Sequence, residues 1–195
     1  AFVGVLFLTP DSLFIRLATI ETWGLLFYRG AIPFIVVLIG LLILYRSNFF
    51  KLLFSMGAPG LVYAGTFALT NITFIVSIQN TNVANTLVMI AMAPMLSAIL
   101  SGIFLKENPD KKTWAAIIIT FLAVIFIFND SIRLGNIIGD IFGIITALGL
   151  AIGAVVIRSA KSRNLVPGAV IGKLLVAIFA VFLVKGRNFL SLKDS

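Results

Sequence analysis

Long apolar runs separated by short polar connectors fill almost the whole of this chain. A helix needs about 20 mostly apolar residues to cross a bilayer, and it pairs its own backbone polar groups there. A membrane β-barrel would instead alternate apolar and polar positions. The unbroken runs therefore predict an all-α integral membrane protein, a multi-span helical bundle of about seven transmembrane helices, at roughly 1–19, 23–45, 56–78, 82–104, 113–129, 136–158 and 167–184.

The composition agrees with a chain whose solvent is lipid. Of the 195 residues 61% are hydrophobic and only 11% are charged, and an ordinary soluble domain does not have these proportions. The sequence contains neither His nor Cys. Imidazole bases, thiolate nucleophiles and the usual zinc sites are therefore excluded. We expect no catalytic residue, no cofactor and no metal.

The positive charges follow the connectors and predict the orientation of the helices. A net charge of +8 in a soluble protein would suggest nucleic acid, but here eight cations follow spans two, four and six: Arg46, Lys51, Lys106, Lys111, Lys112, Arg158, Lys161 and Arg163. By the positive-inside rule these connectors and the N-terminus are cytoplasmic. The tail carries Lys185, Arg187 and Lys193 on the opposite side, against the rule. The expected partner is the lipid bilayer, and no nucleic acid is expected.

Three ionisable residues, Asp11, Arg29 and Lys173, lie inside predicted spans. A charge at the bilayer centre costs at least about 2.5–3.5 kcal/mol, so such residues usually face a wet cavity, a partner or a substrate. Pro10 interrupts the first span beside Asp11, and broken helices often coordinate substrate near the midplane. Alternatively, Asp11 lies near an interface and pairs with Arg16, and the long side chain of Arg29 reaches outward to the headgroups.

The types of these polar residues predict the kind of solute. A guanidinium offers a planar fork to a carboxylate or phosphate, and we expect Lys173 to be the inward counterpart of an outward Arg29. Two fixed cations favour anionic or zwitterionic solutes such as amino acids over lipophilic cations. The amides of Asn71 and Asn85 either line the same cavity or bind neighbouring helices together. Asp140 lies so early in the sixth span that we expect it in a solvated helix start.

Four short motifs, in order over about a hundred residues, resemble the EamA-type domain of the drug/metabolite transporter superfamily. In the third motif Lys106 stands where the family has Gly. The motifs are Phe27-Tyr28-Arg29-Gly30, then Thr81-Asn82-Val83-Ala84-Asn85 with Pro94 after it, then Phe104-Leu105-Lys106-Glu107, and finally Thr113-Trp114.

This resemblance implies a ten-helix secondary transporter, built as two inverted five-helix repeats that rock around a midplane site. Residues 1–130 would be the first repeat and 131–195 the start of the second, so we expect the chain to be a fragment of a longer protein. The resemblance further implies a bacterial inner membrane and a small-molecule substrate, and a homodimer is one possible assembly.

Two other classes of protein remain open. A non-transporting helical subunit would use the same spans to assemble with a partner. A membrane-embedded enzyme would need an acid–base pair near the interface, and the scattered carboxylates of a chain without His argue against it.

Overall fold

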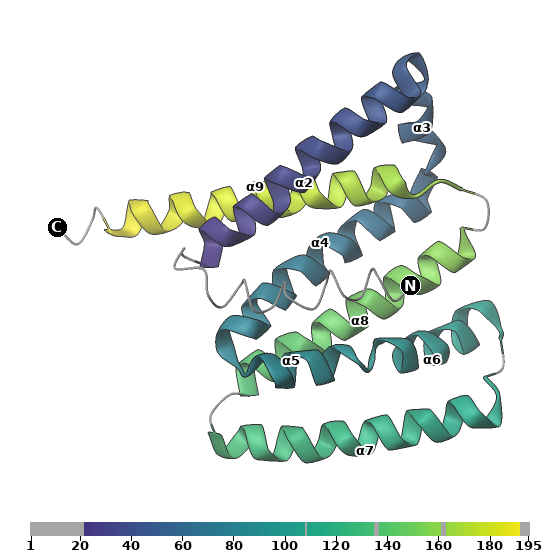
Figure 1. Ribbon diagram of the computed structural model, residues 1–195, viewed down its shortest axis with the longest axis vertical. Helices are drawn as coiled ribbons and strands as arrows, with labels where there is room; N and C mark the ends of the chain where they lie inside the picture. The colour runs from purple at the N-terminus through teal and green to yellow at the C-terminus, as the bar shows by residue number, and fades with distance from the viewer. Residues whose placement is uncertain (1–21, 108, 135–136, 161–162, 192–195) are drawn as a thin grey trace. The chain divides into compact units, whose positions relative to one another are not determined.

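The computed structural model describes residues 22–107, 109–134, 137–160 and 163–191 (Figure 1). Over these residues all the regular secondary structure is helical, which confirms the predicted all-α class. Asp11 and the first predicted span lie outside the described residues. The helices are α2 (Thr22–Tyr45), a 3₁₀ turn η1 (Arg46–Asn48), α3 (Phe49–Ser55), α4 (Gly57–Asn80), α5 (Val83–Ile90), α6 (Ala93–Leu105), α7 (Lys111–Leu134), α8 (Ile137–Ser159) and α9 (Val166–Ser191).

Several of these helical segments are long and apolar enough to cross a bilayer. Within the described residues these segments are Trp23–Tyr45, Gly57–Asn80, Val83–Leu105 and Ile137–Ser159, and Val166–Phe182 is a shorter apolar helix. Large apolar side chains also point outward, with Leu44 78%, Phe126 80% and Phe182 74% exposed. An outer surface of this kind suits acyl chains and not water. The chain is therefore a multi-span integral membrane protein.

The fourth predicted span is broken into two helices. Residues Ala91 and Met92 form a turn between α5 and α6, and Pro94 follows in the first turn of α6. Proline has no N–H for the carbonyl four residues earlier and clashes with the preceding turn, so the helix restarts there. The short helix α3 was not predicted either, since it lies in the connector after the second span.

The chain forms two compact units. The α2–α9 unit comprises residues 22–69 and 156–191, and the α5–α8 unit comprises residues 70–155, both within the described ranges. Helices α4 and α8 each contribute one part to each unit. Each unit takes residues from both sides of position 130, so compactness and the predicted sequence repeats divide the chain differently.

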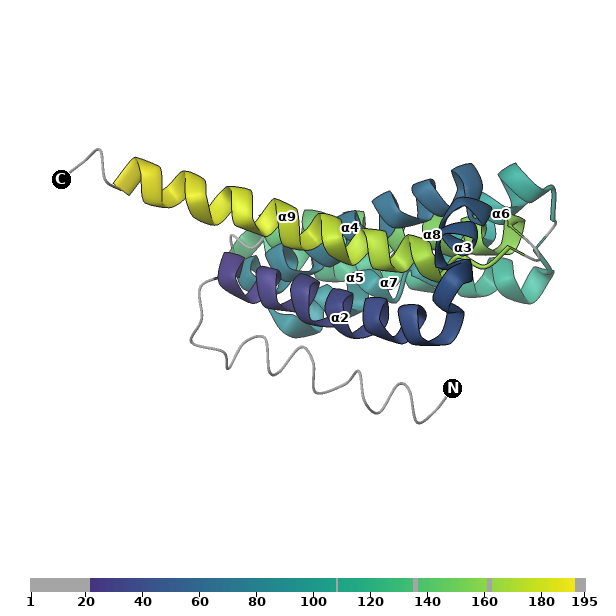
Figure 2. The ribbon, with the colours of Figure 1, turned by 90° about the horizontal axis from the view of Figure 1, so that it is seen from above.

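In the α2–α9 unit, glycines let helices pack closely. Helices α2 and α9 run side by side in opposite directions (Figures 1 and 2). A Cβ added to Gly168 of α9 would lie 2.7 Å from the carbonyl oxygen of Gly60 in α4, and one added to Gly172 would lie 2.9 Å from that of Ala64. Small residues at such spacing allow membrane helices to approach backbone to backbone. This packing holds α9 against both α2 and α4.

In the α5–α8 unit, a small apolar core joins three helices. Met89 and Met92 pack with Val124 of α7 and Ala147 of α8, and all four are buried. Gly143 lies against this core, because a Cβ there would come within 3.0 Å of the Met89 side chain. The flexible methionines fill the space left by the small residues of α8.

Candidate functional site

The crossing of α2 and α9 brings two of the predicted cationic residues close together. A Cβ added to Gly30 would lie 2.7 Å from the backbone nitrogen of Ala177 and 3.0 Å from the carbonyl oxygen of Lys173. Arg29 and Lys173 therefore flank one point of backbone contact, and both side chains are half-buried. The crossing lies about 12 Å from the start of α2 and about 16 Å from the start of α9. Because the two helices run in opposite directions, these two lengths add up to nearly the ~30 Å thickness of the hydrocarbon core.

The ammonium group of Lys173 lies over an aromatic ring, and a second ring lies beside the first. The Lys173 ammonium lies 5.1 Å from the centroid of the Phe67 ring, and the Phe67 and Tyr63 rings are 5.8 Å apart. A cation over an aromatic face is attracted by the ring quadrupole, more strongly where water is scarce. This contact keeps the ammonium within the α2–α9 unit. We name Arg29, Lys173, Phe67 and Tyr63 the basic site.

A pocket that shares Tyr63 with the basic site lies in the same unit. It has a volume of about 330 Å³ and is lined by Tyr63, Ile157, Arg163, Asn164, Leu165, Val166 and Ala169. Asn164 donates through its amide to the Tyr45 hydroxyl at 3.4 Å. Tyr63 belongs to both the pocket and the basic site, and Ala169 precedes Lys173 by one turn of α9. The charge pattern assigned Arg163 a topological role only, and its place in this pocket was not predicted.

The four described residues among the five predicted site residues are divided between the two units. Arg29 and Lys173 lie in the α2–α9 unit, whereas Asn71 and Asn85 lie in the α5–α8 unit, and Asp11 is outside the described residues. Asn85 is half-buried and donates to the Thr81 hydroxyl at 3.5 Å, a bond that links the first turn of α5 to the preceding loop. Asn71 is also half-buried. The assignment of these amides to a substrate site stays a prediction.

Hydroxyl pairs join the helices of the α5–α8 unit. The Thr73 and Thr146 hydroxyl oxygens are 2.7 Å apart, which links α4 to α8, and those of Ser77 and Thr86 are 2.8 Å apart, which links α4 to α5. All four side chains are buried. Hydroxyl bonds between helices stabilise membrane bundles, typically by about 0.6 kcal/mol each.

Asp140 is buried and not solvated, so the prediction of an exposed helix start was wrong. Its exposed fraction is 0%, and neither carboxylate oxygen has a hydrogen-bond partner among the described residues. The neighbouring glycine explains the burial. A Cβ on Gly139 would lie within 2.6 Å of Thr81, so the start of α8 packs directly on the turn between α4 and α5.

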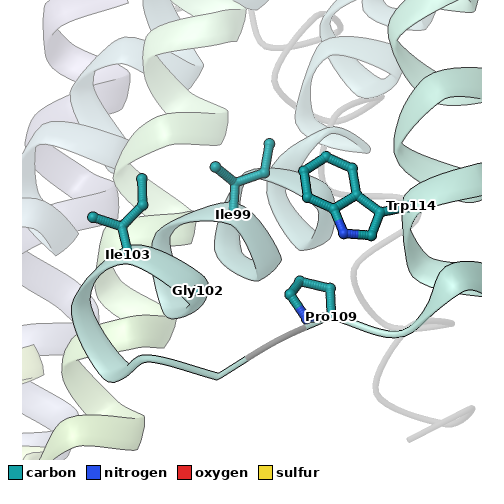
Figure 3. A pocket seen from close by; sticks show the side chains of 5 residues that line it. All are labelled: Ile99, Gly102, Ile103, Pro109 and Trp114. Carbon is teal, nitrogen blue, oxygen red and sulfur yellow. The ribbon is translucent and has the colours of Figure 1, made fainter.

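A second pocket, of about 380 Å³, lies in the α5–α8 unit between the end of α6 and the start of α7 (Figure 3). Its lining residues are Ile99, Gly102, Ile103, Pro109 and Trp114, none of them charged. Trp114 is 49% exposed. This lining suits an acyl chain better than a polar metabolite.

Lys106 ends α6 in a left-handed conformation. Its φ is 57° and its ψ 32°, and its N–H bonds back to the Ser101 carbonyl. This region favours glycine, because a Cβ there approaches the following carbonyl. The conformation explains why a glycine is expected at this position, and the third motif is therefore structural.

Comparison with known families agrees with the four motifs. A model of the EamA-like transporter family matches residues 1–129 of the chain. The chain belongs to the EamA-like transporter family. The resemblance drawn from the motifs is thereby confirmed, and the matched region ends one residue before the predicted repeat boundary at 130. No curated protein and no solved structure matches the chain.

Some important residues had a recognisable signal that the hydrophobic pattern did not reveal. Thr70, Thr73 and Ser77 recur at three- and four-residue spacing, which places them on one face of α4. Gly168 and Gly172 form a small-xxx-small pair, as Gly139 and Gly143 of α8 also do. Within the described residues there is no cluster of acidic side chains that could hold a metal ion.

Proposed function

We propose that this EamA-like protein transports small anionic or zwitterionic metabolites, such as amino acids, as a secondary transporter working by alternating access. The observation that carries this proposal is the basic site. Two half-buried cations flank the crossing of α2 and α9, and one of them lies over an aromatic ring. The lengths of the two helices up to this crossing would put it near the middle of the hydrocarbon core. Fixed cations at this depth are expensive unless they meet a solute or a partner.

The chemistry of the basic site favours a substrate with a carboxylate. Arg29 offers a planar fork of donors that matches a carboxylate with two parallel hydrogen bonds, and Lys173 adds a compact positive charge. The rings of Phe67 and Tyr63 present apolar faces for a side chain or methylene group. The same two charges repel lipophilic cations, so those are poor substrates.

The pocket beside the basic site supports a path for the solute. Arg163 and Asn164 line it, and Tyr63 connects it to Phe67 and Lys173. An anion drawn first to Arg163 would move along Tyr63 toward Lys173, a distance of one to two helical turns. This stepwise arrangement favours weak binding at each point, which lets a solute both enter and leave.

Flux measurements in liposomes test the proposal. The protein is reconstituted, and uptake of labelled glutamate, alanine and tetraphenylphosphonium is compared. We expect uptake of the two amino acids and none of the lipophilic cation. Arg29→Ala and Lys173→Ala should each lower amino-acid flux about tenfold or more, since each removes a charge-assisted hydrogen bond worth roughly 1.5–3 kcal/mol.

Lys51→Ala is the matched control, because Lys51 is exposed in α3 of the same unit. This variant loses the same charge and should transport normally. Wild-type flux in a folded Arg29→Ala or Lys173→Ala protein would contradict the basic site. Uptake of tetraphenylphosphonium in preference to glutamate would contradict the substrate class.

We also propose the arrangement in the membrane that the charge pattern predicts. The connectors after α2, α6 and α8 would be cytoplasmic, as would the N-terminus, in a bacterial inner membrane. Residues 1–130 would form the first inverted repeat and 131–195 the beginning of the second. In support, the family match ends at residue 129, and α2 and α9, the second helices of the two proposed repeats, pack together in opposite directions.

A further inference from the structure

Asp140 is a fully buried carboxyl group in the α5–α8 unit, apart from the basic site. Its exposed fraction is 0%, and neither of its oxygens has a hydrogen-bond partner among the described residues. An ionised carboxylate in such surroundings loses its hydration without compensation, which costs several kcal/mol or more. A group this costly in its charged form calls for a ligand that neutralises it.

Two glycines of α8, the adjacent Gly139 and Gly143 about one turn further on, indicate what packs around Asp140. Gly139 packs on the turn at Asn80 and Thr81, and Gly143 packs on Met89 and on the Ser77 hydroxyl. Asp140 lies between these two levels, on the stripe of α8 that continues through Gly143 to Ala147. That stripe meets α5 and α7 at the Met89 and Val124 core. The carboxyl group is thus enclosed by protein.

Among the described side chains, those of the segments that pack on Asp140 carry no charge that could neutralise it. The parts of α4 and α5 in this unit, Thr70–Asn80 and Val83–Ile90, contain no ionisable residue. On α7, Lys111 and Lys112 lie at the opposite end, whereas Asp130 and Arg133 lie in its last turns, with side chains outside the described residues. On α8 itself, Arg158 stands at the far end of the helix.

A proton fits this site better than a metal cation. Hard cations such as Ca²⁺ and Mg²⁺ require about six or more oxygen ligands, and they prefer carboxylates, carbonyls and water. No described oxygen donor or acceptor is within hydrogen-bond distance of the Asp140 oxygens. A proton needs one carboxylate oxygen only, because the O–H bond it forms removes the charge.

We propose that Asp140 is the proton-binding site that couples transport to the proton gradient, an inference that rests on the proposed transport function. In the described conformation the carboxyl group carries a proton on one oxygen. When the contact between Gly139 and Thr81 opens, water reaches the group, the O–H bond breaks and the proton passes to water. Reclosure requires the carboxylate to take up a proton again.

The route to water is short. Gln79, Asn80 and Asn82 in the turn beneath Gly139 are exposed, and Thr81 between them is buried. Separation of α8 from this turn by the width of one water molecule would hydrate Asp140. The opening would break the close Gly139 contact, and no hydrogen bond of the carboxyl group itself would be lost.

Chemical labelling tests the proton site without reference to any substrate. Dicyclohexylcarbodiimide is apolar and reacts with protonated carboxyl groups in apolar surroundings. The full protein in detergent is treated between about pH 5 and pH 9, and the modified peptide is identified by mass spectrometry. We expect label on Asp140 that decreases as the pH rises, and none at this position in Asp140→Asn. The exposed Asp110 is the internal control and should remain unlabelled.

Proton coupling is tested in liposomes with a pH gradient. In wild-type protein, one proton per solute across one pH unit should drive up to about tenfold accumulation. Asp140→Asn should still exchange labelled for unlabelled solute but lose this accumulation. Equal accumulation in both proteins, or no label on Asp140 at any pH, would overturn the inference.

The outcomes separate this inference from the proposed function. If Asp140→Asn does not fold, the labelling of wild-type protein still decides whether the group binds a proton. Label on Asp140 in a protein that moves none of the tested amino acids would support the proton site and contradict the proposed substrate class. Normal amino-acid flux in a protein whose Asp140 is never labelled would support the proposed substrate class and contradict the proton site.

Discussion

The two compact units solve the problem of polar groups in a membrane in opposite ways. The α2–α9 unit keeps full positive charges, Arg29 and Lys173, half-buried at a helix crossing beside aromatic rings. The α5–α8 unit pairs neutral hydroxyl groups between helices, as in Thr73 and Thr146, and encloses Asp140, which has no hydrogen-bond partner among the described residues. On the proposed function, the half-buried cations stay accessible to a solute, whereas the hydroxyl groups hold helices together by bonding one another.

Both units rely on glycine where helices approach most closely. Gly168 and Gly172 let α9 reach α4 in one unit. In the other, Gly139 lets α8 reach the α4–α5 turn, and Gly143 lets it reach Met89 of α5 and Ser77 of α4. Hydrophobic burial drives association only weakly in lipid, so close packing supplies much of the stability. The largest mutational effects are therefore expected at these contacts.

Gly168→Ala should destabilise the α2–α9 unit most. The added Cβ would lie 2.7 Å from the Gly60 carbonyl oxygen, so the helices must separate, at a cost of roughly 1–3 kcal/mol. The measurement is the free energy of unfolding in a denaturing detergent titration. Gly65→Ala is the control, because a Cβ there meets nothing within 4 Å, and its better helix propensity should stabilise α4 by up to about 1 kcal/mol.

Each unit has a residue with left-handed backbone angles, and replacing these two residues should change the free energy of unfolding in opposite directions. Gly57 of the α2–α9 unit has φ +58° and Lys106 of the α5–α8 unit has φ 57°. Lys106→Gly should raise the unfolding free energy by about 1 kcal/mol, because it removes the Cβ strain. Gly57→Ala should lower it by a similar amount and also displace Arg163, which contacts Gly57. A stabilising Gly57→Ala would show that this strain does not operate here.

The hydroxyl pair of the α5–α8 unit should have a smaller effect. A double-mutant cycle with Thr73→Val and Thr146→Val should give a coupling energy of about 0.6 kcal/mol, the usual value for such bonds in membranes. Each hydroxyl also bonds a carbonyl of its own helix, that of Thr70 or Phe142, which moderates the single effects. Transport should persist in both variants, whereas a loss of transport in the folded proteins would place the pair in the solute path.

The smallest effect is expected at two helix starts, one in each unit. Asp110 begins α7 and accepts hydrogen bonds from the Thr113 hydroxyl and from its N–H, and these bonds lower the pKa of Asp110 below 3.8. The charged cap therefore stabilises α7 above about pH 3.8 and is lost as the pH falls through the lowered pKa. Asn164 begins α9 by accepting from the Val166 N–H and does not titrate.

Hydrogen exchange at these helix starts measures the difference. Protection of residues 111–114 should fall on acidification below about pH 4 relative to residues 166–169, after correction for intrinsic rates. Asp110→Asn should remove the pH dependence of the first segment. Parallel loss of protection at both helix starts would mean that acid acts on the whole bundle and not through this cap.

The sequence predicted the helices well but the site only in part. The apolar runs gave the described spans to within a few residues, and the motifs around Arg29 and Lys106 indicated the family. Arg29 and Lys173 were both selected because charge is rare in a span, but their meeting at Gly30 could not be foreseen. Asp140 was misjudged because position along a helix does not reveal whether a neighbouring loop covers it.

The sequence alone determined that this is a membrane protein, where most of its helices begin and end, and which transporter family it belongs to. Hydrophobic length is enough to predict the spans, because the bilayer acts on each segment separately. The four short motifs indicated the family. Only the tertiary structure decided which faces meet, and so which polar groups are buried, paired or available. Lipid and protein interiors are almost equally apolar, so hydrophobicity does not show which face of a helix meets lipid and which meets another helix. Close contacts such as Gly30 on Ala177 and Gly139 on Thr81 determine this.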